Sequence, residues 1–288
     1  MTLGGRNCPY CRYYTAVDEP HCGRCGRWLP PGPLAALVHE ASRVQHPATK
    51  ALCALSIVVF ALQLAVAGGL GGGLFTGMPV WVAARFGGLL GDDGLTEPYR
   101  LLAACFVHYG VLHIVFNVMA LADLGRALET RFGPARTVLA YVITGVFGFL
   151  VSTWWYAPAL VPTAGASGAA FGFVGVLLGD RLARRDPGFR QALVRTVLYS
   201  VVWYFVLRTN QAAHLGGLAA GMGLGVLFAK ESRPWRIARA VNIAAGVCLA
   251  LCVVSLVLPH FSPEWRVLRS LEEQRRARRG HAASALDE

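Results

Sequence analysis

Seven long apolar runs constrain the fold of this chain more than any other feature of its sequence. They cover residues 51–67, 110–125, 137–156, 167–179, 193–207, 212–229 and 238–259. A helix needs about 20 apolar residues to cross the hydrocarbon core of a bilayer, and each run spans or nearly spans that distance. The runs are continuous rather than alternating, which excludes a membrane β-barrel. With 55% hydrophobic and 15% charged residues among 288, we therefore expect an all-α polytopic membrane protein rather than a disordered or water-soluble one.

The positions of the basic residues predict how the helices are oriented. The net charge is +11, and eighteen Lys and Arg residues lie in residues 1–50 and in the gaps after the second, fourth and sixth runs. The alternate gaps hold only Arg85, Arg100 and Arg208. Since cytoplasmic loops of membrane proteins are enriched in Lys and Arg, the N-terminus is expected in the cytoplasm. The charge therefore reflects membrane topology, and no nucleic-acid partner is expected.

The C-terminal tail disagrees with this pattern. Seven spans would place residues 261–288 outside, yet this tail carries six arginines. Either the tail is exported regardless of its charge, or the seventh run does not span. Because longer tails follow the charge rule less strictly, we expect seven spans.

Four cysteines near the N-terminus form two CxxC pairs, Cys8-Pro-Tyr-Cys11 and Cys22-Gly-Arg-Cys25. Two such pairs supply the four thiolates of a tetrahedral structural zinc site. A cytoplasmic location argues against disulfides, although two reducible dithiols or a degenerate site remain alternatives. We expect a zinc-ribbon-like module with four cysteine ligands at residues 1–33, followed by a linker at 34–49.

Two polar residues share one face of the second apolar run. His113 and Asn117 are four residues apart, and this spacing stacks them along a helix. Polar groups inside a membrane are costly and often functional. The alternative is a hydrogen bond between neighbouring helices, which is common for Asn in membranes.

Ser167 stands at the start of the short fourth run, in Pro162-Thr-Ala-Gly-Ala-Ser-Gly168. Gly and Pro in this stretch oppose helix formation, so a loop must reach membrane depth, which is tolerated only where it lines a protein cavity. Free N–H groups and the helix dipole favour negative charge at a helix N-terminus. Ser167 is therefore placed as a nucleophile would be; the alternative is an ordinary N-cap.

His214 begins the sixth run and is followed by a glycine stripe that matches one in the fourth run. The stripes are Gly217, Gly221 and Gly225, and Gly168, Gly172, Gly175 and Gly179. Such stripes allow close helix packing, which would bring His214 within reach of Ser167, the minimum for an activated nucleophile. Alternatively, the glycines serve packing alone and His214 is a core residue.

No carboxylate is placed to complete a catalytic triad. Asp123, Glu129 and Asp180 lie at the wrong end of their runs, so a Ser–His dyad is expected rather than a triad.

Together these residues resemble the rhomboid family of intramembrane serine proteases. Gly165-Ala-Ser167-Gly168 is similar to its GxSG motif, Ala213-His214 to its catalytic-histidine helix, and His113-x-x-x-Asn117 to its HxxxN motif. Pro98-Tyr-Arg100 and His108 resemble first-loop features, and Glu129 matches a structural position at the end of the second helix. The resemblance covers roughly residues 50–230 and keeps the order of the motifs.

The resemblance implies a rhomboid-like six-helix bundle at residues 50–230, a seventh transmembrane helix at 231–260 and a basic tail at 261–288, which we expect to be disordered. It implies that Ser167 attacks a peptide bond, that His214 is the general base, and that His113, Asn117 and the Ser167 N–H hold the oxyanion. Structural or substrate-gating roles are implied for a further set: His108, Arg100, Glu129, Phe171, Gly165, Gly168, Gly217 and Gly221. Phe171 replaces a Tyr found in some members, and because the ring is kept we expect activity to survive.

The implied function is an intramembrane serine endopeptidase that cuts transmembrane segments of other proteins, a form of regulated proteolysis. The bacterial type of the family would place the chain in a bacterial cell membrane, in contact with lipid and transmembrane substrates. No cofactor is expected for catalysis, and the sequence does not indicate an oligomeric state. The alternatives are an inactive rhomboid-like protein that binds membrane clients and a solute transporter, which would predict inverted repeats that the two halves of the chain do not show.

Overall fold

A computed structural model describes most of the chain. It covers residues 5–8, 13–16, 19–24, 29, 45–68, 77–156, 160–207, 209–231 and 234–284. The chain divides into two compact units, Met1–Pro47 and Ala48–Glu288, which are described separately.

The N-terminal unit contains a short antiparallel hairpin. Its strands are β1 (Gly5–Asn7) and β2 (Tyr14–Ala16). Cys8 follows β1 directly, and its backbone N–H donates to Tyr13 O at 2.8 Å. Cys8, Cys22 and Leu29 are buried together in a small cluster. Cys11 and Cys25 lie outside the described residues, so the structure describes only two of the four cysteines predicted as zinc ligands.

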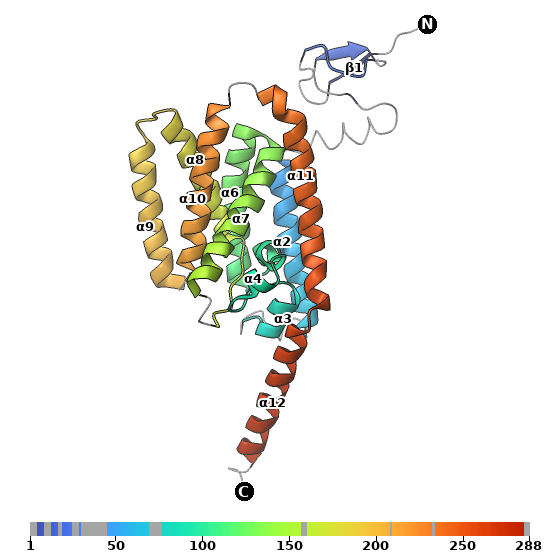
Figure 1. The fold of residues 1–288 in the computed structure, drawn as a ribbon, viewed down its shortest axis with the longest axis vertical. Helices are drawn as coiled ribbons and strands as arrows, with labels where there is room; N and C mark the ends of the chain where they lie inside the picture. The colour runs from blue at the N-terminus through green and yellow to red at the C-terminus, as the bar shows by residue number, and fades with distance from the viewer. Residues whose placement is uncertain are drawn as a thin grey trace. The chain divides into compact units, whose positions relative to one another are not determined.

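The second unit is built of helices (Figure 1). The long ones are α2 (Pro47–Val66), α6 (Val111–Phe132), α7 (Pro134–Tyr156), α8 (Ser167–Ala183), α9 (Phe189–Leu207), α10 (Gln211–Lys230), α11 (Pro234–Val257) and α12 (Glu264–Ser284). Short elements fill the loop between α2 and α6 and the turn after α11: α3 (Val80–Arg85), α4 (Asp93–Thr96), α5 (Arg100–Ala103), η2 (Ala104–Phe106) and η3 (Leu258–Phe261). Each of the seven apolar runs therefore corresponds to one helix.

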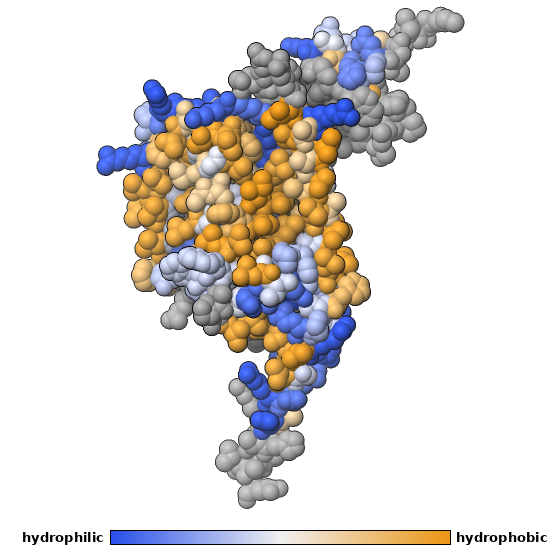
Figure 2. All heavy atoms as spheres, in the orientation of Figure 1, coloured by the Kyte–Doolittle hydropathy of each residue, from blue (hydrophilic) through white to orange (hydrophobic). Residues whose placement is uncertain are grey.

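Within the described residues, five helices are long and apolar enough to cross a membrane. These segments are Pro47–Val66, Val111–Phe132, Pro134–Tyr156, Gln211–Lys230 and Ile237–Phe261. Two of the seven predicted spans are not among them: α8 has only 17 residues, and α9 carries Arg190 and Arg195 in its first half. On the face seen in Figure 2, apolar residues form a band across the bundle, and hydrophilic residues gather near its two ends.

Helix α10 packs mainly against α8 and α7, and glycines make this packing possible. A Cβ on Gly221 would overlap the backbone oxygen of Gly172, and a Cβ on Gly172 would overlap the side chain of Thr144. The helix backbones are therefore in direct contact along the stripes that the sequence indicates. Helix α9 packs against α8 and lies at the side of the bundle (Figure 1).

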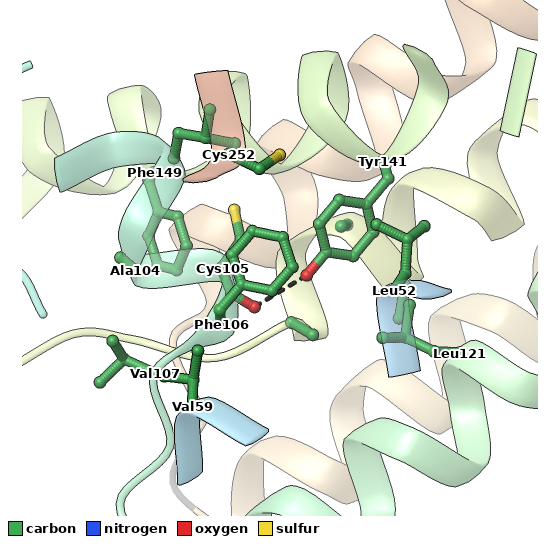
Figure 3. Close-up of a cluster of buried hydrophobic side chains, with 14 of the residues drawn as sticks. Leu52, Val59, Ala104, Cys105, Phe106, Val107, Leu121, Tyr141, Phe149 and Cys252 are labelled. Carbon is green, nitrogen blue, oxygen red and sulfur yellow. Dashed lines mark hydrogen bonds between the residues drawn. The ribbon is translucent and has the colours of Figure 1, made fainter. Parts of the chain in front are cut away.

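The apolar core joins α7 to the loop that precedes α6 (Figure 3). The Tyr141 hydroxyl donates a hydrogen bond to Cys105 O at 2.9 Å, and Phe106 lies against the same ring, with centroids 5.3 Å apart. Both aromatic side chains are fully buried. This contact fixes η2 inside the bundle. The neighbouring residue of η2, Ala104, accepts a backbone hydrogen bond from Gly165.

The expectation of a disordered tail is wrong for residues 264–284, which form helix α12. Two ion pairs between residues four apart stabilise this polar helix, Arg269–Glu273 at 2.9 Å and Arg276–Glu272. Its first turn is also anchored, because Glu264 contacts Arg100 of the loop between α2 and α6. The tail therefore starts at the end of the bundle where that loop lies.

Candidate active site

Ser167 is the first residue of α8, and an irregular segment leads into it. The backbone N–H and C=O of Leu89 both bond to Thr163, each at 2.9 Å. The N–H of Gly165 donates to Ala104 O at 2.9 Å. Gly165 has φ = +127°, a conformation that residues other than glycine rarely adopt. Residues 163–165 are thus held on both sides before the chain turns into the helix.

His214 lies in the first turn of α10, and Asn210 fixes that turn. The Asn210 side chain caps the helix by accepting from the Ala213 N–H at 3.0 Å. Its amide Nδ2 donates to Ser152 Oγ at 2.6 Å and to Thr163 Oγ1 at 3.3 Å. Asn210 therefore ties the start of α10 to the end of α7 and to the segment before Ser167.

The structure brings Ser167 and His214 together. Ser167 Oγ and His214 Nε2 are 2.8 Å apart, and the His214 side chain is buried, with 2% exposure. The Phe171 ring stacks on the imidazole with centroids 4.3 Å apart and planes 12° apart. Within the described residues, His214 Nδ1 has no hydrogen-bond partner, so no carboxylate there orients this ring. The aromatic stack holds it instead.

His113 and Asn117 line the other side of the segment that precedes Ser167. Asn117 Nδ2 donates to His113 O at 2.7 Å. A Cβ built on Gly165 would lie 2.7 Å from His113 Nε2 and 3.9 Å from Asn117 Nδ2. His113 Nδ1 accepts from the Tyr109 N–H at 3.3 Å, which leaves the ring proton of the neutral form on Nε2. Both side chains can therefore present an N–H toward the backbone next to Ser167.

His108 packs against His113. It is fully buried, and the two imidazole centroids are 5.1 Å apart. Its backbone N–H donates to Gln63 Oε1 at 3.1 Å, and Gln63 Nε2 donates to His108 O at 3.3 Å. His108 Nδ1 donates to Phe106 O at 3.1 Å. These contacts fix His108 between α2 and η2 without bringing it to Ser167.

Glu129 and Arg100 lie away from the Ser167–His214 pair, and the remaining predicted glycines belong to the helix packing around it. The Glu129 carboxylate accepts from the backbone N–H groups of Ala48 and Thr49, at 3.1 and 2.8 Å, and so caps α2. Arg100 is buried in the loop between α2 and α6. A Cβ on Gly217 would overlap Gly168 O, which places both of these glycines, like Gly221, in the packing of α8 against α10.

Sequence reasoning missed three polar residues that position the site, namely Asn210, Gln63 and Thr163. Only Asn210 carries a local signal, because Asn directly before an apolar helical run is a typical N-cap. Gln63 and Thr163 have long-range partners, so nothing in their neighbouring residues indicates a role.

Comparison with known proteins covers the same part of the chain. The rhomboid domain matches residues 95–231. Rhomboid protease GluP of Bacillus subtilis (strain 168) is 33% identical over 129 residues, which is 43% of this chain and 25% of that protein. Rhomboid-like protease 1 of Toxoplasma gondii is 32% identical over 171 residues, 54% of this chain and 56% of its own length.

This chain therefore spans between a quarter and just over half the length of these two relatives. A third, Putative rhomboid protease YdcA of Bacillus subtilis (strain 168), is 33% identical over 139 residues, which is 47% of this chain but 69% of that relative. The matched domain contains Ser167, His214, His113 and Asn117. On this similarity the chain belongs to the rhomboid family, which includes intramembrane serine proteases, and it is a multi-pass membrane protein.

Proposed function

We propose that this protein is an intramembrane serine endopeptidase that uses Ser167 and His214 as a catalytic dyad. The observation that carries the proposal is the 2.8 Å contact between Ser167 Oγ and His214 Nε2. When the imidazole carries its proton on Nδ1, the Ser167 hydroxyl donates to Nε2, which is the arrangement of a nucleophile with its general base. The stacking of Phe171 on His214 supports the same interpretation.

In the first step, Ser167 Oγ attacks the carbonyl carbon of the scissile peptide bond while His214 Nε2 takes the hydroxyl proton. The resulting oxyanion accepts hydrogen bonds from His113 Nε2, Asn117 Nδ2 and the Ser167 N–H. Hydrogen-bond donors placed where charge develops lower the barrier of acyl transfer. The C–N bond then breaks, His214 gives its proton to the leaving amine, and the substrate remains as an ester on Ser167.

In the second step, water attacks this ester and His214 again acts as the base. The carboxylate product leaves, and the proton returns to Ser167 Oγ. Neither step requires a metal or a nucleotide.

The substrates proposed are transmembrane segments of other proteins. A helical peptide bond is protected by its own backbone hydrogen bonds, so a substrate helix must unwind before Ser167 can reach it. Helix-breaking residues near the cleavage point should therefore favour cleavage. The distribution of Lys and Arg supports an orientation with residues 1–50 in the cytoplasm, which puts Ser167 toward the opposite side of the membrane.

The test is labelling of the purified protein with a serine-reactive fluorophosphonate probe. We expect wild-type protein to be labelled and both Ser167→Ala and His214→Ala to lose the label, because the hydroxyl is the attacking group and the imidazole activates it. A rate loss on the order of 10³ or more is expected from removal of either member of such a pair. Thermal unfolding of each variant would show that the fold is kept.

A folded wild-type protein that takes no label would contradict the proposal. It would favour a rhomboid-like protein that binds membrane clients without cutting them. Label that persists in His214→Ala would mean that another group activates Ser167.

For the N-terminal unit we propose a structural zinc ion bound by Cys8, Cys11, Cys22 and Cys25. Cys8 and Cys22 are buried in the same small cluster, as two ligands of one closed site would be. The described residues contain no group of three or more metal-ligating side chains, and the other two cysteines lie outside them.

A further inference from the structure

The segment that follows α11 packs against residues 77–110, which we call the first loop. We call residues 259–269 the C-terminal clasp. His260 Nδ1 donates to Arg85 O at 2.7 Å, and its ring meets Phe86 edge-on with centroids 5.0 Å apart. A Cβ on Gly87 would lie 3.1 Å from Pro259. The end of α3 is therefore covered by η3.

The first turns of α12 continue this contact along α3. The Arg85 guanidinium lies 4.7 Å from the Trp265 ring centroid, and the Arg269 guanidinium lies 5.2 Å from that of Trp81. The Trp265 indole N–H donates to His260 O at 3.2 Å. Two cation–π contacts thus join the clasp to α3: in one the arginine belongs to α3, and in the other it belongs to the clasp.

Glu264 brings a carboxylate of the clasp to a buried arginine of the first loop. The Arg100 side chain is fully buried. It donates to Ala84 O at 2.7 Å and Gly88 O at 3.2 Å, and it pairs with Glu97. Its Nη2 makes no hydrogen bond in the described part of the chain, and the ion-pair partner of that nitrogen there is Glu264, at 2.8 Å. A buried guanidinium left without this partner would be destabilised.

Arg100 is linked to both backbone segments that hydrogen-bond to residues 163–165, the chain leading to Ser167. On one side it bonds Gly88 O, and the next residue, Leu89, forms the two backbone bonds to Thr163. On the other side Arg100 begins α5, which continues into η2, where Ala104 O accepts from the Gly165 N–H. A displaced Arg100 would therefore move both supports of residues 163–165.

We propose that Glu264 is a positioning residue for the active site. By pairing with Arg100 it holds the first loop where that loop supports the segment leading to Ser167. The proposal rests on the proposed function, and it assigns a role to a part of the chain beyond the matched rhomboid domain, which ends at residue 231.

The surroundings of Glu264 make this contact sensitive to pH. Its carboxyl faces Asp93 of α4, Glu97 and Arg100, with Tyr99 beside them and Arg85 under the neighbouring Trp265. Burial is the main cause that raises the pKa of Glu264 to about 7; Arg100 acts against this rise, while Asp93 and Glu97 add to it. Burial also raises the pKa of Asp93. The charged form of Glu264, and with it the full ion pair, therefore develops as pH rises through about 7.

The test compares wild type with Glu264→Gln and with Glu272→Gln, a matched change on the same helix at a carboxylate that pairs with Arg276 instead. The rate constant of fluorophosphonate labelling would be measured from about pH 6 to about pH 8. We expect Glu264→Gln to slow labelling on the order of tenfold at about pH 8, where Glu264 of the wild type is charged, and only slightly at about pH 6. Glu272→Gln should match wild type throughout. A ratio of wild type to Glu264→Gln that stays near one over the whole pH range would overturn the proposal.

A second measurement does not depend on catalysis. Hydrogen exchange of the Leu89, Thr163 and Gly165 amides should be faster in Glu264→Gln than in wild type at about pH 8, while amides in the α8–α10 contact stay unchanged. If Glu264→Gln fails to fold, Glu264→Asp keeps the charge but shortens the reach, and the same amides should exchange faster. Unchanged exchange in folded variants would refute the positioning role even if Ser167 is labelled. Faster exchange in a protein that is never labelled would refute the proposed function and leave the positioning role standing.

Discussion

Gly165 is the residue on which the segment before Ser167 depends most directly. Its φ of +127° strains any other residue, and a Cβ there would lie 2.7 Å from His113 Nε2. We expect Gly165→Ala to cost about 1–3 kcal/mol of backbone strain and to displace His113 from the proposed oxyanion position. The labelling rate of Ser167 should fall on the order of tenfold, because the loss of about 1.4 kcal/mol of oxyanion stabilisation corresponds to about a factor of ten in rate.

Gly110 offers a matched control for this change. It lies directly before α6 in an extended conformation, φ 175°, and nothing lies within 4 Å of a Cβ built on it. Gly110→Ala should therefore leave both the labelling rate and the unfolding temperature close to wild type. Equal effects of the two substitutions would show that the geometry of Gly165 is not what limits the reaction.

At the scale of helices, the contact between α8 and α10 sets the distance between Ser167 and His214. A Cβ on Gly221 would overlap Gly172 O, whereas nothing lies within 4 Å of a Cβ on Gly223 of the same helix. We expect Gly221→Ala to separate the helices at a cost of about 1–3 kcal/mol, and to lower both the unfolding temperature in detergent and the labelling rate. Gly223→Ala should change neither, and a destabilisation as large as that of Gly221→Ala would contradict this account.

These helices and their contact can be predicted from the sequence because the signals are local. Apolar runs mark the long helices, and glycine at regular spacing marks the faces that approach closely. This spacing predicts His214 near Ser167, and the two side chains lie 2.8 Å apart. The number of membrane-spanning helices is harder to predict from hydropathy. Helix α8 is short and α9 contains two arginines, and neither is among the five candidate spans of the described residues.

The first loop and the clasp cannot be predicted in the same way. Arg100 belongs to a recognisable motif, but one of its ion-pair partners, Glu264, lies far along the chain in a tail whose composition predicts disorder. The tail is a polar, charged segment, and nothing in its composition indicates that its first turn packs on α3. Long-range ion pairs and cation–π contacts have no periodic signature in the sequence, so only the folded structure shows them.

At the scale of the whole molecule, the two units divide the chemistry between them. Every residue proposed for catalysis, for the oxyanion and for the clasp belongs to the unit Ala48–Glu288, and all four proposed zinc ligands belong to Met1–Pro47. A structural metal site stabilises the module that contains it. Loss of the metal should therefore unfold the small unit without dismantling the Ser167–His214 contact.

The double variant Cys8→Ser/Cys22→Ser tests this division. We expect purified wild-type protein to contain about one zinc ion per chain and the double variant to contain none, because each paired knuckle loses one thiolate. Fluorophosphonate labelling of Ser167 should stay close to wild type in the same preparation. Metal analysis that finds no zinc in the wild type would remove the proposed site. Zinc loss accompanied by loss of label would instead mean that the N-terminal unit acts on the catalytic one, since no residue of the proposed dyad or oxyanion site was changed.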